Sequence, residues 1–200
     1  MFDPEFEAHL RQRAKAELRR HMRGVRGAVP PQACAARSER IVARVIESPE
    51  WYHARALGLF WPMLERNEVD VRPLDEAARA SGKIVAYPRM SDEGMILAVA
   101  DPASLHERGH LFAEPDEAAP PLEIDDKVLV IVPALAVDPN GNRIGYGRGL
   151  YDRLLTAISP PAFALAVAYD FQVVAEIPVT NGDRAVGAVF TDSRCFRPQS

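Results

Sequence analysis

Apolar side chains follow a helical period over the first part of the chain, and prolines interrupt this pattern twice. Within residues 5–27 the apolar positions recur every four residues, which predicts an amphipathic helix: Phe6, Leu10, Ala14, Leu18 and Met22. A second helical pattern covers residues 31–46, between the prolines at 30–31 and a break at Ser48-Pro49.

Short apolar runs then alternate with further helical stretches. The runs predict strands at 56–61, 84–87, 95–99, 128–132, 163–168 and 188–191. The helical stretches cover 71–81, with Gly82 as the stop signal, and 149–158, and a short element is expected at 173–176. Proline has no backbone N–H, so we expect Pro88 to end the strand before it. Alternating strands and helices predict a three-layer α/β/α fold with a mostly parallel sheet.

The length of the chain fits one domain, which we expect to span residues 1–200. Residues 101–126 are rich in Pro, Glu and Asp and are typical of a long surface loop. We therefore expect a variable loop or small insertion over residues 92–122.

Composition and charge narrow the classes of function. The net charge of −4 argues against a nucleic-acid partner, including RNA bound by the arginine-rich first helix, because such surfaces are usually basic. The first ten residues are too polar for a signal peptide, and no apolar run is long enough to span a membrane. The two cysteines show no metal-binding spacing. These features favour a cytoplasmic protein.

A glycine-rich loop follows the most apolar run of the chain, residues 128–132. The loop contains Gly141, Arg143, Gly145, Gly147, Arg148 and Gly149. Glycines let a backbone approach a ligand closely, and N–H groups at a helix start together with arginines attract anions. Since ligands bind at the carboxyl ends of parallel strands, we predict a phosphate or polyanion site here. Tight packing between strand and helix is the alternative role for these glycines.

Two common nucleotide-binding motifs do not fit this loop. It lacks the G-K-[ST] ending of a P-loop, and it does not follow the first strand as a dinucleotide-binding G-x-G-x-x-G does. A P-loop NTPase and a dinucleotide-binding domain are therefore disfavoured.

The chain resembles the 5-formyltetrahydrofolate cyclo-ligase family, also called 5,10-methenyltetrahydrofolate synthetases. The family hallmark resembles D-x-(apolar run)-P-G-x-x-F-D-x-x-G-x-R-x-G-x-G-x-G-Y-Y-D. This chain matches it at Asp126, Pro133, Asp138, Gly141, Arg143, Gly145, Gly147, Gly149, Tyr151 and Asp152. It departs at Ala134 and Val137, and at Leu150, which replaces the first tyrosine of the pair. The resemblance spans residues 13 to 192 and is weakest over 92–122.

Other segments extend the resemblance. Lys15 and Arg19 match a family pair of cations on the first helix, and their spacing places both on one helix face. Trp61 and a following acid match a segment that contacts the folate; we choose Glu68 for that acid, with Glu65 as the alternative. Residues 83–89 and 186–192 resemble two family strands.

The resemblance implies a Rossmann-like fold of the NagB/RpiA/CoA-transferase type and an ATP-dependent ligase. It would cyclise 5-formyltetrahydrofolate to 5,10-methenyltetrahydrofolate through a phosphorylated formyl intermediate. Catalytic roles fall to Arg143, Arg148 and Tyr151. ATP would be held by Lys15, Arg19 and the loop residues Arg143, Ile144, Gly145, Tyr146, Gly147, Arg148, Gly149, Leu150 and Tyr151.

The remaining implied contacts concern the folate and a metal ion. Trp61, Glu68 and Tyr151 would contact the folate, with or without a polyglutamate tail. Asp152 and Asp183 would bind Mg²⁺, which prefers carboxylate and phosphate oxygens. A monomer is expected, with a dimer left open. The alternative is a family relative that binds nucleotide or folate as a regulator or carrier without cyclising it, and Leu150 is the departure that favours it.

Overall fold

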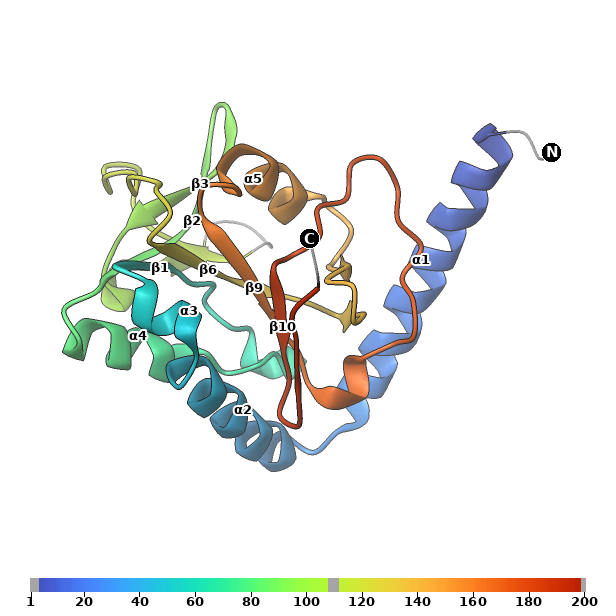
Figure 1. Cartoon of the computed structure of the whole chain (residues 1–200), viewed down its shortest axis with the longest axis horizontal. Helices are drawn as coiled ribbons and strands as arrows, with labels where there is room; N and C mark the ends of the chain where they lie inside the picture. Colours follow the sequence, from blue (N-terminus) through green and yellow to red (C-terminus); the bar gives the residue numbers. More distant parts are fainter. Residues whose placement is uncertain (1–3, 108–111, 199–200) are drawn as a thin grey trace.

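The computed structural model describes residues 4–107 and 112–198, and its centre is a seven-stranded sheet (Figure 1). The strand order is β11-β10-β9-β6-β1-β2-β3. Pairs from β10 to β2 are parallel, whereas β3 and β11 pair antiparallel at the two edges. The strands are β1 (Ala56–Gly58), β2 (Ile84–Ser91), β3 (Gly94–Val99), β6 (Val128–Pro133), β9 (Phe163–Val167), β10 (Ala188–Phe190) and β11 (Cys195–Phe196). The predicted mostly parallel sheet is confirmed.

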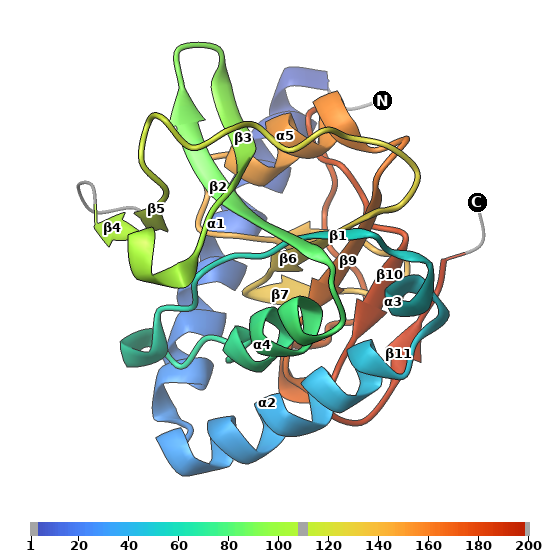
Figure 2. The same ribbon diagram turned by 90° about the vertical axis from the view of Figure 1, so that its left-hand side faces the viewer.

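Helices cover both faces of the sheet, and one more helix crosses its end (Figures 1 and 2). One face carries α2 (Pro31–Ile46), α3 (Pro49–His53) and α4 (Arg72–Ala80). The other face carries α5 (Leu150–Ile158). The long α1 (Pro4–Ala28) lies apart from both layers. Among the described residues, no helix combines the length and the apolar character needed to cross a membrane.

The central strand β6 shows why its sequence is apolar at every position. Leu129 and Ile131 pack into the core under α2, α3 and α4. Val128, Val130 and Val132 point the other way and pack into the core under α5. A parallel strand that is buried on both faces needs an unbroken apolar run rather than an alternating one. Each such side chain contributes roughly 1.5–3 kcal/mol by leaving water.

A third, smaller apolar cluster fixes α1 against the glycine-rich loop. Leu18 and Met22 of α1 pack against Ala136, Ile144 and Ile177. Ala136 and Ile144 belong to the short hairpin of β7 (Ala136–Val137) and β8 (Arg143–Ile144). Phe6 and Leu10, on the same predicted stripe, remain 49% and 47% exposed. The predicted helix is confirmed, and Leu18 and Met22, in the C-terminal half of its stripe, form the contact with this cluster.

The prediction that Pro88 ends its strand is wrong, since β2 continues to Ser91. Ala86 uses its carbonyl to pair with Leu59 N after β1. Pro88, two residues on, directs its nitrogen to the same side, where β1 has already ended at Gly58. No ladder bond is therefore lost. Met90, the next residue on that side, donates its N–H to the buried Glu114 carboxylate at 2.8 Å.

Other predicted boundaries also shift. The strand expected at 56–61 stops at Gly58, and a 3-10 turn, η1 (Leu64–Arg66), follows. Residues 173–176 form no helix or strand; Val173 makes only an isolated bridge to Val137 after the turn η3 (Asp170–Gln172). Ser48, which follows α2, also caps α3: its hydroxyl accepts a hydrogen bond from the backbone N–H of Trp51 at 3.2 Å.

The segment 92–122 holds more structure than a loop. It contains β3, the turn η2 (Pro102–Ser104), and the hairpin of β4 (His106–Glu107) and β5 (Ala113–Glu114). Residues 108–111 lie outside the described residues. Its end runs along β3, where Leu122 N bonds to Leu97 O at 2.8 Å, and so covers this edge of the sheet. Its role as a variable insertion stays a prediction.

Gly141 offers a test of the loop that follows β7. Its φ is +79°, and an added Cβ would collide with the carbonyl oxygen of Val186. We expect Gly141→Ala to lower the free energy of unfolding by about 2 kcal/mol or more, because strain and a backbone clash add.

Denaturant unfolding provides the measurement, with Gly24→Ala as the matched control. Gly24 lies inside α1 with open space around it, so its replacement should raise the stability by about 0.5–1 kcal/mol. A Gly141→Ala protein as stable as the parent would contradict the packing of this loop.

Candidate active site

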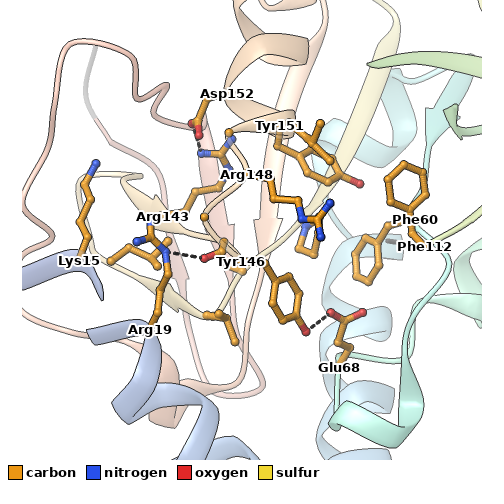
Figure 3. A pocket seen from close by; sticks show the side chains of 18 of the residues that line it. Lys15, Arg19, Phe60, Glu68, Phe112, Arg143, Tyr146, Arg148, Tyr151 and Asp152 are labelled. Atoms are coloured by element: carbon orange, nitrogen blue, oxygen red, sulfur yellow. Dashed lines mark hydrogen bonds and ion pairs between the residues drawn. The ribbon is translucent and has the colours of Figure 1, made fainter. Parts of the chain in front are cut away.

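A cavity of about 1120 Å³ opens beyond the carboxyl ends of β1 and β6 (Figure 3). Its walls come from α1, the segment after β1, the glycine-rich loop, the start of α5 and residues 180–183. All the residues that the sequence predicts for ATP, folate and metal line this cavity: Lys15, Arg19, Trp61, Glu68, the loop from Arg143 to Asp152, and Asp183. The alternative acid Glu65 is not among the lining residues; its side chain is exposed.

Besides Gly141, two further glycines shape the loop. Gly147 and Gly149 have φ values of +96° and +64°, which residues other than glycine rarely adopt. A Cβ on Gly147 would lie 3.3 Å from the Arg19 guanidinium. Glycine at 147 therefore lets α1 and the loop come into contact.

Arg143 leaves one donor free at the cationic end of the cavity. Its Nη1 donates to Oδ1 of Asp152 at 2.9 Å and to the carbonyl of Arg184 at 3.1 Å. Its Nη2 is buried and has no hydrogen-bond partner among the described residues. Buried polar atoms are almost always satisfied, so this nitrogen marks a place for an acceptor such as a phosphate oxygen.

Arg19 adds further charge at this end, and Arg148 also lines the cavity. Among the described residues, Arg19 forms a hydrogen bond only through Nε, which donates to the carbonyl of Gly145 at 3.0 Å. Arg148 is exposed and forms no hydrogen bond or ion pair within the described part of the chain. Both guanidinium groups thus retain donors that can reach an anionic ligand.

Lys15 is 6% exposed and is held by residues from the other end of the chain. Its Nζ bonds to the Asp183 carboxylate and donates to Oγ1 of Thr180 at 3.1 Å. Burial would raise the pKa of Asp183, yet the bonds from Lys15 and from the N–H of Thr180 lower it below its usual value. The carboxylate is therefore ionised at neutral pH, and the pair closes one wall of the cavity.

The two predicted metal ligands fit a loosely held hard cation. Oδ1 of Asp152 accepts from Arg143 and from Arg184 N at 3.2 Å, while its Oδ2 accepts no hydrogen bond from the described residues. Nowhere in residues 4–107 and 112–198 do three His, Cys, Asp or Glu side chains gather as a metal cage. Mg²⁺ commonly takes one or two carboxylates plus phosphate and water, a donor set that Asp152 and Asp183 can supply.

The opposite end of the cavity is aromatic. Phe60, Trp61, Phe112 and Tyr151 line it, and Trp61 packs edge-on against Tyr87 with ring centroids 6.1 Å apart. Leu150, at the departure from the family pattern, also lines the cavity and packs into the core under α5. The cavity is therefore suited to a flat ring at one end and a polyanion at the other.

Glu68 is 5% exposed and stands at the aromatic end. Its Oε1 accepts the Tyr146 hydroxyl at 2.7 Å and its Oε2 accepts Met63 N at 2.9 Å. Burial raises the pKa of this carboxyl, and the bonds from Met63 and Tyr146 act against that increase. A buried carboxylate beside aromatic rings can orient a ligand through its N–H groups.

Sequence reasoning missed several residues that line the site, among them Arg26, Thr180 and Phe112. Arg26 could have been predicted from the sequence, because positions 15, 19, 22 and 26 share one face of a helix. Thr180 and Phe112 carry no such pattern, and only the folded chain brings them to the cavity.

Comparisons with known proteins show which family the chain is similar to. The sequence profile of the 5-formyltetrahydrofolate cyclo-ligase family matches residues 11–192. A 5-formyltetrahydrofolate cyclo-ligase of Mycolicibacterium smegmatis is 41% identical over 71 residues, which are 36% of this chain and 37% of that protein. One of Mus musculus is 25% identical over 194 residues, covering 88% of this chain and 90% of that protein.

A solved structure shows the same fold. The solution structure of Aquifex aeolicus 5,10-methenyltetrahydrofolate synthetase superimposes with a TM-score of 0.80 at 26% identity and covers 93% of both chains. The profile match spans most of the sequence, and the glycine-rich loop lines the cavity as described above. The chain therefore belongs to the 5-formyltetrahydrofolate cyclo-ligase family of enzymes.

Proposed function

We propose that this chain converts 5-formyltetrahydrofolate and ATP to 5,10-methenyltetrahydrofolate, ADP and phosphate. The supporting observation is one cavity with Lys15, Arg19 and Arg143 at one end and, at the other, aromatic rings with the buried Glu68 carboxylate beside Arg26 and Arg66. A triphosphate matches the first end and a reduced pterin the second. Family members are ATP-dependent ligases of this substrate, which supports the same assignment.

The chemistry needs no nucleophile from the protein. The formyl oxygen attacks the γ-phosphorus, an O–P bond forms, and the bond to the β-phosphate oxygen breaks to release ADP. N10 then attacks the formyl carbon and loses its proton, the C–O bond breaks, and phosphate leaves. Enzymes promote such transfers by positioning the reactants and stabilising the developing charge.

The residues of the cationic end supply that stabilisation in our proposal. Arg143, through its unpartnered Nη2, and Arg148 face the transferred phosphoryl group. Lys15 and Arg19 hold the remaining phosphates against the loop. Mg²⁺ at Asp152 and Asp183 would neutralise phosphate charge. Tyr151 and Trp61 border the pterin, and burial raises the pKa of the Tyr151 hydroxyl, so it stays protonated as a donor.

An absorbance assay tests the proposal. Purified protein with Mg-ATP and 5-formyltetrahydrofolate should form methenyltetrahydrofolate, which absorbs in the near ultraviolet. ATP binding without product would overturn the enzymatic function and leave a carrier or regulatory role.

Lys15→Ala tests the wall formed by α1. The change removes a buried cation from the phosphate end, so we expect the KM for ATP to rise by about tenfold or more. The KM for 5-formyltetrahydrofolate should change little. Steady-state kinetics with each substrate varied in turn measure both constants.

Arg20→Ala is the control for Lys15→Ala. Arg20 lies on the exposed side of α1 and pairs only with Glu17 among the described residues. Its removal should leave both KM values unchanged. If Lys15→Ala behaved in the same way, Lys15 would not contact the nucleotide.

Asp152→Asn tests the metal assignment. Loss of one anionic ligand should raise the Mg²⁺ concentration for half-maximal activity by about tenfold or more, which a Mg²⁺ titration at fixed ATP measures. Asp125→Asn is the matched control, since Asp125 also pairs with an arginine, Arg55, at 2.7 Å but lies outside the cavity. An unchanged Mg²⁺ dependence in Asp152→Asn would remove Asp152 from the metal site.

A further inference from the structure

Tyr146 stands in the glycine-rich loop, but its side chain turns toward Glu68 at the aromatic end of the cavity (Figure 3). The family pattern leaves position 146 open. The resemblance implies that Tyr146 helps to hold ATP as part of the loop, but it gives the side chain no contact with Glu68. Within the described residues, Glu68 receives its only side-chain hydrogen bond from the Tyr146 hydroxyl.

Arg26 fixes the direction of that hydrogen bond. Its Nη2 donates to the Tyr146 hydroxyl at 2.6 Å, and Arg26 itself is buried. A guanidinium can only donate, so the phenolic oxygen must accept from it. The single Tyr146 proton is left for Oε1 of Glu68, 2.7 Å away. The chain of bonds therefore has one polarity, from Arg26 through Tyr146 to Glu68.

The backbone around Glu68 is anchored to the same helix. Asn67 adopts a left-handed conformation with φ 53° and donates its side-chain N–H groups to the carbonyls of Arg26 and Val29, at 3.0 and 2.9 Å. The Tyr169 hydroxyl donates to the carbonyl of Glu68 at 3.0 Å. The distance between Arg26 and Glu68 is thus set by several independent contacts.

We propose that Tyr146 and Arg26 are positioning residues, which hold the Glu68 carboxylate oriented toward the pterin ring. The inference rests on the proposed function, because the ligand of Glu68 is the folate. Each carboxylate oxygen accepts one hydrogen bond from the protein and keeps a second lone pair. Those lone pairs face N–H donors such as the ones on a reduced pterin.

The charges around Glu68 explain why this support is needed. Arg26 from α1, Arg66 from η1, and the hydroxyls of Tyr146 and Tyr151 are the titratable groups that act on it. Arg23 and Arg66 are more exposed and lie over the Tyr146 ring, 5.7 and 5.6 Å from its centroid. Burial raises the pKa of the Glu68 carboxyl, and the hydrogen bond from Tyr146 opposes that increase. Removing the Tyr146 hydroxyl therefore raises the pKa of Glu68 further.

The test is the pH profile of Tyr146→Phe. We expect its KM for 5-formyltetrahydrofolate to rise by about tenfold at neutral pH, with kcat changed less than about threefold and the KM for ATP unchanged. The acid limb of kcat/KM for the folate should move up by about one pH unit, because the carboxylate protonates more easily. Arg26→Met should shift the profile in the same direction, and Arg26→Lys should restore part of it.

Tyr52→Phe is the matched control, because Tyr52 is 74% exposed and lies outside the cavity. Circular dichroism melting confirms that each variant is folded. Turnover by the parent protein would support the proposed function. If the pH profile of Tyr146→Phe then equalled that of the parent, the positioning role would be overturned. If the parent lacked turnover, calorimetric binding of 5-formyltetrahydrofolate at acid and neutral pH would decide. The positioning role would be overturned if parent and variant bound 5-formyltetrahydrofolate with equal affinity at both pH values, or if the parent did not bind it.

Discussion

The arrangement of the site depends on one fully buried carboxylate, Asp138. It accepts hydrogen bonds from Asn140 N, Asn142 N and the Asn142 side chain, at 3.0, 2.9 and 2.9 Å, and from Ile177 N at 3.0 Å. These bonds close the turn between β7 and β8 and dock a distant segment on it. Ile144 and Ile177 then form the apolar surface on which α1 rests. A charge buried without such donors would be strongly destabilising, so the turn and the carboxylate require each other.

Charge is distributed unevenly in a protein that is acidic overall. The net charge of −4 conceals a cavity lined by several guanidinium groups, of which Arg143 and Arg148 keep free donors. Acidic partners such as Asp152 and Asp183 neutralise this end only in part. A local positive potential in a cleft attracts anionic ligands whatever the sign of the whole molecule. The net charge of the whole chain therefore bears on solubility, whereas the local charge of the cavity determines which ligands it attracts.

Much of the fold could be predicted because its elements have clear patterns: a helical period in α1 and α2, and an unbroken apolar run in β6. Pro88 misled the prediction, because whether a missing N–H matters depends on where the neighbouring strand ends. Short elements such as α3 and β11 contain too few residues to show a period. In the site, the loop residues follow from their motif. The choice between Glu65 and Glu68 could not be made from the sequence. The left-handed backbone at Asn67 turns one acid outward and the other inward.

The shallow seat of α1 has a thermodynamic consequence. Leu18 and Met22 provide its apolar contact, while Lys15, Arg19 and Arg26 on the same face reach across to the loop and to residues 180–183. A ligand that binds between these cations and the loop joins the two parts. Ligand binding and helix docking are then linked equilibria, in which each strengthens the other by the same free energy. Ligand binding should accordingly strengthen the docking of the first helix, and helix docking should strengthen ligand binding.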